Sequence, residues 1–137
     1  MISSDRIVGL YATAAENPEY CALVVTKYIK DIKALIADFK KEGPIYRDAY
    51  GKVERALDHA SVDSANSIIR MRNGSAVFFV SYGTLEKLNH FRFPCDPCRI
   101  VIDPDLTVSA DHIMSLISTE AVTKEITEWI SSIPVNE

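Results

Sequence analysis

A short apolar run with no polar face, CALVVT at residues 21–26, most constrains the fold of this chain. A strand of this composition suits a position buried on both faces, as in a parallel sheet. A second such run, RIVID at residues 99–103, ends on a carboxylate. Helical patterns surround both strands, and the length of 137 residues fits one domain. We therefore expect an α/β fold in a single domain of residues 1–137.

Hydrophobic periodicity predicts helices on both sides of the first strand. Apolar residues recur at helical spacing over residues 6–16, and residues 27–42 carry the clearest apolar stripe, with most lysines off it. The same spacing predicts a helix over residues 45–60, although Gly51 weakens it. Two further helices are expected over 109–118 and 119–132.

The segment SIIRMRNGSAVFFVS, residues 67–81, predicts a tight β-hairpin. Two β-rich runs, 67–72 and 75–81, flank Asn73-Gly74, a pair that suits a type I′ turn with positive φ at both positions. A polar connection is expected over 82–92. The fold class is thus a small, mostly parallel sheet with a β-hairpin, flanked by helices. The hairpin strands have room to lie between the two buried strands.

Composition and the N-terminus exclude several classes of protein. An apolar content of 47% and a net charge of −4 exclude intrinsic disorder, and the acidity disfavours a dedicated binder of phosphate backbones. No apolar run is long enough for a membrane span, and residues 1–6 lack the pattern of a signal peptide. Three cysteines make no disulfide framework. We expect a cytoplasmic protein with no membrane partner.

The order of these elements carries a resemblance to a known family. The segments LYATAAENPEY, CALVVT, KYIKDIKALIADFKK, SIIRMRNGSAVFFVS and RIVID follow one another over residues 1–106. In this order and spacing they resemble the ATPase domain of large terminase subunits, the viral DNA-packaging motors of the P-loop NTPase class. The resemblance implies a partial P-loop NTPase-like core.

The resemblance also implies where a nucleotide and Mg²⁺ would bind. The end of the family's phosphate loop falls on residues 1–4, so Ser3 and Ser4 are candidate cofactor-binding residues, with Ser3 at the metal-binding hydroxyl. Asp103 ends the strand that resembles Walker B. Asp103 has an alternative interpretation, because an acidic residue just past a strand often caps the next turn.

The residues that catalyse ATP hydrolysis in this family are not found. The chain has no GxxxxGK[ST] motif, Ile2 stands where the family has a Lys, and Pro104 follows Asp103 where the family has a catalytic Glu. Phosphoryl transfer depends almost wholly on positioning and charge neutralisation. We therefore expect a degenerate or truncated core that is not an enzyme and needs no cofactor.

A C-x-x-C motif at Cys95 and Cys98 offers a second candidate site. Redox motifs of this form open a helix, whereas this one runs into a strand, so redox catalysis is disfavoured. With His90 the two thiols supply three ligands for a structural zinc, and Cys21 or His112 could supply a fourth. The alternative is a turn with two half-buried thiols.

Arginines form the candidate nucleic-acid site. Arg70 and Arg72 alternate on the first hairpin strand and thus share a face. Other members of this set are Arg47, Arg55, Arg92 and Arg99. They would either contact nucleic acid or form an exposed sheet edge where charge discourages strand addition.

Two functions follow as hypotheses. The first is a non-catalytic interaction protein whose partner is an NTPase or a nucleic-acid-processing assembly, for example a viral or phage accessory, inhibitor or decoy acting on a DNA-packaging motor. A missing first strand would leave a sheet edge for a partner strand. The alternative is a nucleotide- or nucleic-acid-binding protein without turnover, which would use Ser3, Ser4, Asp103 and the arginines.

Overall fold

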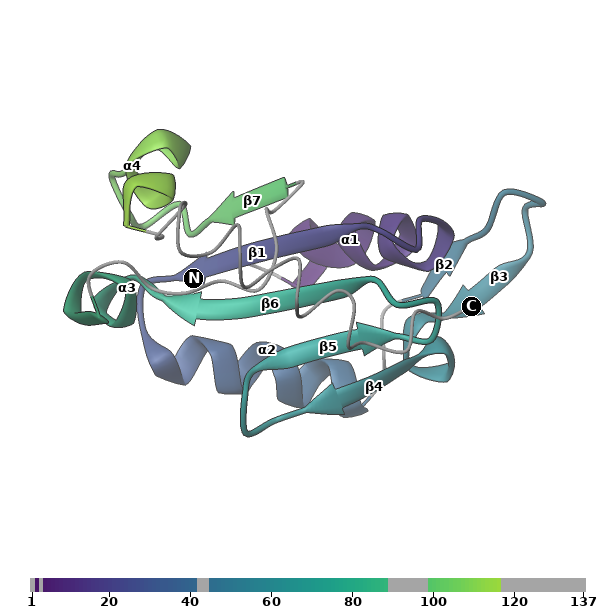
Figure 1. Ribbon diagram of the computed structural model, residues 1–137. Helices are drawn as coiled ribbons and strands as arrows, with labels where there is room; N and C mark the ends of the chain where they lie inside the picture. Colours follow the sequence, from purple (N-terminus) through teal and green to yellow (C-terminus); the bar gives the residue numbers. More distant parts are fainter. Residues whose placement is uncertain (1, 3, 42–44, 89–98, 117–137) are drawn as a thin grey trace.

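A five-stranded sheet forms the centre of the computed structural model, which describes residues 2, 4–41, 45–88 and 99–116. The strand order is β4-β5-β6-β1-β7 (Figure 1). Strand β1, Cys21–Thr26, pairs in parallel with β6, Ala76–Ser81, on one side and with β7, Arg99–Ile102, on the other. Strands β5, Ile68–Met71, and β4, Ala60–Asp63, continue the sheet in antiparallel pairing. The α/β prediction is confirmed, and the sheet is mixed with a parallel core.

Strand β1 is the central element predicted from CALVVT, and its bounds are those expected. All six of its residues are buried. It neighbours β7 directly, with Ala22 opposite Arg99 and Val25 opposite Ile102. The hairpin strands therefore do not lie between the two apolar strands. They join the sheet on the other side of β1, where β6 pairs with the second edge of β1.

Helices lie on both faces of the sheet. The helices α1, Ser4–Glu16, and α2, Ile29–Lys41, cover one face, behind the sheet in Figure 1. Their side chains form one core with alternate residues of the strands, and the rings of Tyr11 and Phe39 meet there at 4.8 Å. The remaining strand residues form a second core, which includes Leu85 and Ile113. The helices predicted over 6–16 and 27–42 are confirmed as α1 and α2.

The helix predicted over residues 45–60 is wrong. This segment forms a two-stranded hairpin of β2, Ile45–Arg47, and β3, Val53–Arg55, then the 3₁₀ turn η1, Ala56–His59, and the start of β4. Gly51 has a φ of 80°, and the Asp48 carboxylate accepts backbone N–H bonds across the turn. This local turn chemistry outweighs the helical spacing of the apolar residues.

The β5–β6 hairpin is confirmed, but its turn is not of type I′. Gly74 has a φ of 98°, whereas Asn73 is not among the described residues with positive φ. The Gly74 N–H donates to the Met71 carbonyl at 3.1 Å, as in a three-residue loop with a glycine in the left-handed region. The Asn73 side chain instead binds the end of α1, with Nδ2 2.7 Å from the Ala14 carbonyl.

Two shorter helices contribute Leu85 and Ile113 to the second core. The segment 82–92, predicted as a polar connection, begins with α3, Tyr82–Leu88. The helix predicted over 109–118 is found as α4, Ala110–Ser115, where the Ser109 hydroxyl accepts the His112 N–H. The helix predicted over 119–132 lies outside the described residues. None of the helices in the described part of the chain has the length and apolar character needed to span a bilayer.

Candidate binding surfaces

Asp103, the candidate metal and nucleotide residue, is tied to the backbone around it. Its side chain is buried, and its two carboxylate oxygens accept the Lys27 N–H at 3.2 Å and the Asp105 N–H at 3.0 Å. Burial raises the pKa of Asp103, and the Asp105 and Lys27 N–H groups are among the groups that lower it; the net pKa lies below its usual value. The carboxylate thus joins the ends of β1 and β7 and caps the turn that follows.

The other residues of the predicted nucleotide site are not brought to Asp103 by any described contact. Ser3 lies outside the described residues, and Ser4 begins α1. Ile2, at the place of the family's Lys, is fully buried in the core between α1, α2 and the sheet. An apolar side chain in this position offers no charge to a phosphate.

Hydroxyl groups gather at the carboxyl ends of the parallel strands, where α/β proteins commonly bind ligands. Each of them has a local partner: the Thr26 hydroxyl donates to the Tyr28 carbonyl at 2.9 Å, and the Ser81 and Thr84 hydroxyls lie 2.8 Å apart. Within the described ranges, no three His, Cys, Asp or Glu side chains group as metal ligands. These hydroxyls cap turns and helix starts.

The zinc prediction falls mostly on undescribed residues. His90, Cys95 and Cys98 lie outside the described part of the chain. Of the two suggested fourth ligands, Cys21 is disulfide-bonded and His112 meets the Tyr82 hydroxyl at 2.8 Å. The disulfide removes Cys21 as a zinc ligand, and the three-ligand set stays a prediction.

The candidate arginines are spread over the molecule. Arg70 lies on β5 and Arg99 on β7, with β6 and β1 between them. Arg72 follows β5 in the turn beside α1, and Arg92 lies outside the described residues. The structure does not gather the side chains of Arg70, Arg72 and Arg99 into one face.

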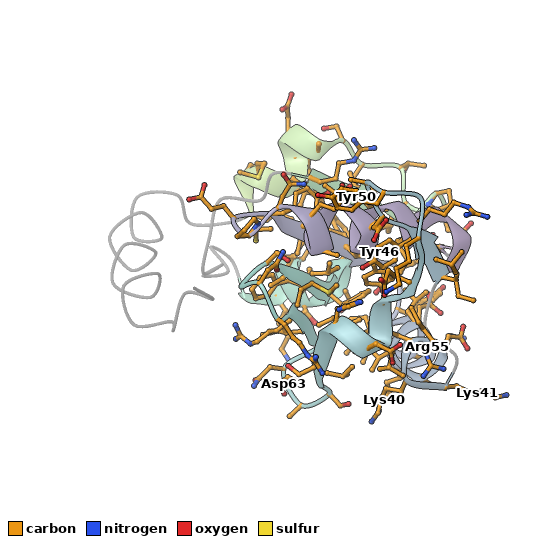
Figure 2. All side chains as sticks on the ribbon, turned by 90° about the vertical axis from the view of Figure 1, so that its right-hand side faces the viewer. Lys40, Lys41, Tyr46, Tyr50, Arg55 and Asp63 are labelled. Atoms are coloured by element: carbon orange, nitrogen blue, oxygen red, sulfur yellow. The ribbon has the colours of Figure 1, made fainter. Side chains whose placement is uncertain are left out.

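Two other arginines do share a face, on the β2–β3 hairpin that projects from the body in Figure 1. The register places Ile45 opposite Arg55 and Arg47 opposite Val53, and all four side chains point outward and are exposed. Tyr50, in the connecting turn, is 96% exposed. Figure 2 looks onto this end of the molecule and shows Arg55 on the same side as Lys40 and Lys41. The hairpin thus presents apolar and cationic groups together.

The largest hollow among the described pockets runs along α2 and has a volume of about 610 Å³. Its large apolar side chains come from the helix itself, and Ile29 at one end is 58% exposed. Three lysines line it as well, and the Lys40 ammonium reaches the Ser64 hydroxyl at 3.4 Å. None of the described residues that line this hollow carries a carboxylate. We call it the α2 groove; its principal residues are Ile29, Ile32, Lys33, Ile36, Lys40 and Lys41.

The helical pattern placed most of these lysines off the apolar stripe and did not indicate the groove. Ile29 is the residue whose position in the sequence points to the groove. It lies at the start of the apolar stripe and extends the stripe beyond the buried face that packs on the sheet. The opposite wall comes from residues 64–67, whose position depends on the β4–β5 connection. That long-range placement is not encoded in the helix pattern.

Comparison with protein-family models, with curated proteins and with solved structures finds no match to this chain, so the terminase resemblance stays a prediction.

Proposed function

We propose that the protein is a non-catalytic interaction protein that binds a protein partner in the α2 groove. The observation that carries this proposal is an apolar hollow of about 610 Å³ whose described lining includes three lysines and no carboxylate. Exposed apolar surface in a concave site is typical of binding surfaces.

The chemistry of the groove defines the segment that it would bind. An amphipathic helix or extended segment would place its apolar side chains against Ile29 and Ile36, and its acidic side chains against Lys33, Lys40 and Lys41. Charges at the rim of such a site accelerate association and are screened by salt. The partner is therefore an acidic, partly apolar segment of another protein.

The terminase resemblance supplies the class of partner, an NTPase or nucleic-acid-processing assembly, with a DNA-packaging motor in the cytoplasm of a host cell as the leading example. Two features of the structure support a role without turnover. Ile2 is buried where the family's phosphate-binding Lys would stand, and both carboxylate oxygens of Asp103 bind backbone N–H groups.

A displayed peptide library selected on the immobilised protein tests the groove. We expect the selected peptides to be enriched in Asp or Glu and in large apolar residues, and to lose binding to Ile29→Asp and to the double variant K40E/K41E. Lys87→Glu, on the exposed side of α3, is the matched control and should bind normally. Selected peptides without acidic residues, or equal binding to Ile29→Asp, would contradict the proposal.

The partner class has its own experiment. Wild-type protein and Ile29→Asp are used in parallel to capture proteins from infected native host cells. An NTPase recovered by the wild type and lost with the variant supports the motor-linked role. Recovery of the same proteins by both forms argues against the groove as the docking site.

The β2–β3 hairpin favours a second candidate function, nucleic-acid binding without turnover. Two-stranded ribbons can enter the major groove of DNA, and here Arg47, Arg55 and Tyr50 are all exposed on one hairpin. If this function holds, duplex DNA binding at low salt should weaken steeply as salt rises. The double variant R47A/R55A should lower the salt slope by about 2. Arg99→Ala is the control, because Arg99 lies on β7, an edge strand of the five-stranded sheet, and not on the hairpin.

A further inference from the structure

A second pocket, of about 210 Å³, lies under the β2–β3 hairpin. Its walls come from the end of α1, the hairpin, the η1 turn and the β5–β6 turn, and it shares no residue with the α2 groove. The side chains that matter for its chemistry are Glu16, Tyr46, Asp48, Glu54, His59 and Arg72. Its size suits a small ligand or a single side chain.

Tyr46 lines this pocket and is only 9% exposed. No residue in the described part of the chain forms a hydrogen bond with its hydroxyl. Burial raises the pKa of Tyr46, and the charges of Glu54, Asp48 and Glu16 raise it further. Tyr46 and these three carboxylates all line the pocket, so a phenol and three acidic side chains share its wall.

The carboxylates differ in how far they are already engaged. One oxygen of Glu54 meets His59 Nε2 at 2.9 Å, and the other lies 3.5 Å from the Lys52 ammonium. Asp48 uses Oδ1 for two backbone N–H groups of its turn and keeps Oδ2. Glu16, at the end of α1, has no partner in the described ranges.

The charge balance leaves room for one cation. Lys52 offsets Glu54, and Arg72 at the exposed mouth offsets one of the two remaining carboxylates. Among the Asp, Glu, Lys and Arg side chains named here, one negative charge is then unbalanced. A primary ammonium group has three N–H donors, which match Glu16, Asp48 Oδ2 and the phenol oxygen of Tyr46.

We propose that this pocket binds an alkylammonium group, held by Glu16, Asp48 and Tyr46. The group belongs either to a small free amine or to a lysine side chain of a partner protein. This site is independent of the α2 groove, so it can fail or hold without affecting the proposed function.

Titration of the ¹⁵N-labelled protein with propylamine tests the site, at low ionic strength because its mouth is exposed. We expect chemical-shift changes at the amides of residues 46–54 and 72–73, and none with 1-propanol, which has the same chain without the charge. A parallel titration with the peptide Gly-Lys-Gly distinguishes the sources. Tighter binding of the peptide indicates a partner's lysine, and tighter binding of the free amine indicates a small-molecule ligand.

Two variants assign the contacts. Tyr46→Phe keeps the ring and should weaken amine binding roughly two- to tenfold, as expected for one hydrogen bond. Glu16→Gln should weaken it by about tenfold or more, because a charged acceptor is lost. Glu19→Gln, an equally exposed acidic residue three positions on and outside the pocket, is the control and should bind normally.

The proposal is overturned by any of three results. The first is no shift of the pocket amides at about 10 mM of either probe, a concentration at which even a weak specific site is occupied. The second is equal shifts with 1-propanol, and the third is unchanged affinity in Glu16→Gln. Thermal melting of each variant, compared with the wild type, establishes that the fold is intact when the titration is read.

Discussion

Tyr11 carries a buried hydroxyl that gains nothing from the fold. Its side chain is 1% exposed, and the hydroxyl has no hydrogen-bond partner among the described residues. An unpaired buried hydroxyl costs about 1–3 kcal/mol. Tyr11→Phe keeps the contact with Phe39 and should raise the free energy of unfolding by about 1 kcal/mol in urea titration. Tyr28→Phe, at a half-exposed site, should change nothing, and a destabilised Tyr11→Phe would contradict this reasoning.

Asn73 has the opposite role, because its side chain joins two elements. Nδ2 donates to the carbonyls of Ala14 and Ala15 at 2.7 and 3.0 Å, and Oδ1 accepts from Ser75. Asn73→Ala removes its bonds to both carbonyls and leaves the Ser75 hydroxyl, 2.6 Å from the Ala14 carbonyl, as the remaining side-chain donor there among the described residues. The substitution should lower the free energy of unfolding by about 2 kcal/mol. Asn66→Ala, whose side chain bonds only the nearby Asp63 on the surface, should cost far less. Equal losses in the two variants would refute the bridging role.

Asp103 predicts how stability depends on pH. Its pKa in the folded protein lies below the unfolded value of about 3.9, so the carboxylate stabilises the fold above that pH. This contribution is lost as pH falls through the folded-state pKa. Asp103→Asn should cost about 1–3 kcal/mol at pH 7 and flatten the fall in stability between about pH 5 and 2. Unfolding in urea across that range measures both effects, and Asp111→Asn, on the exposed first turn of α4, is the control.

At the scale of elements, the β2–β3 hairpin depends on one side chain in its turn. Asp48 accepts the N–H groups of Tyr50 and Lys52, both at 2.9 Å. Asp48→Ala should therefore speed hydrogen exchange at these two amides by about tenfold or more, while the amides of β1 keep their protection. Asp58→Ala, whose carboxylate pairs with exposed Arg55 outside the turn, is the matched control. Unchanged exchange at Tyr50 and Lys52 would show that the turn forms without this cap.

The same hairpin shows where prediction from the sequence failed. Apolar residues at helical spacing over 45–60 outnumbered the turn signals in that stretch, yet Asp48 and Gly51 decided the outcome. By contrast, β1 and α2 were predicted correctly. The short all-apolar run of β1 is typical of a buried strand, and the apolar stripe of α2 is typical of an amphipathic helix. Short strands such as β2 carry few residues, and their pairing is decided by turn geometry.

At the scale of the whole molecule, the order of the strands in the sheet could not be predicted from the sequence pattern. The direct pairing of β1 with β7 joins residues far apart in the chain, such as Ala22 and Arg99, and nothing local encodes it. The pocket under the hairpin has the same origin. Tyr46 and Glu16 come together only because the end of α1 packs against the hairpin, and the sequence singled out neither residue.

The two cores should unfold together, because β1 contributes to both. Val24 faces the core under α1 and α2, while Val25 faces the core under α3 and α4. Both side chains are fully buried, so Val24→Ala and Val25→Ala should each lower the free energy of unfolding by about 2 kcal/mol. In each variant, the native NMR signals of Leu35 in α2 and of Ile113 in α4 should be lost in one shared transition in urea, shifted to lower concentration. Leu35 and Ile113 belong to the cores on opposite faces of the sheet. Separate transitions for the two signals, with only one displaced by each substitution, would mean that the faces unfold independently and that β1 does not couple them.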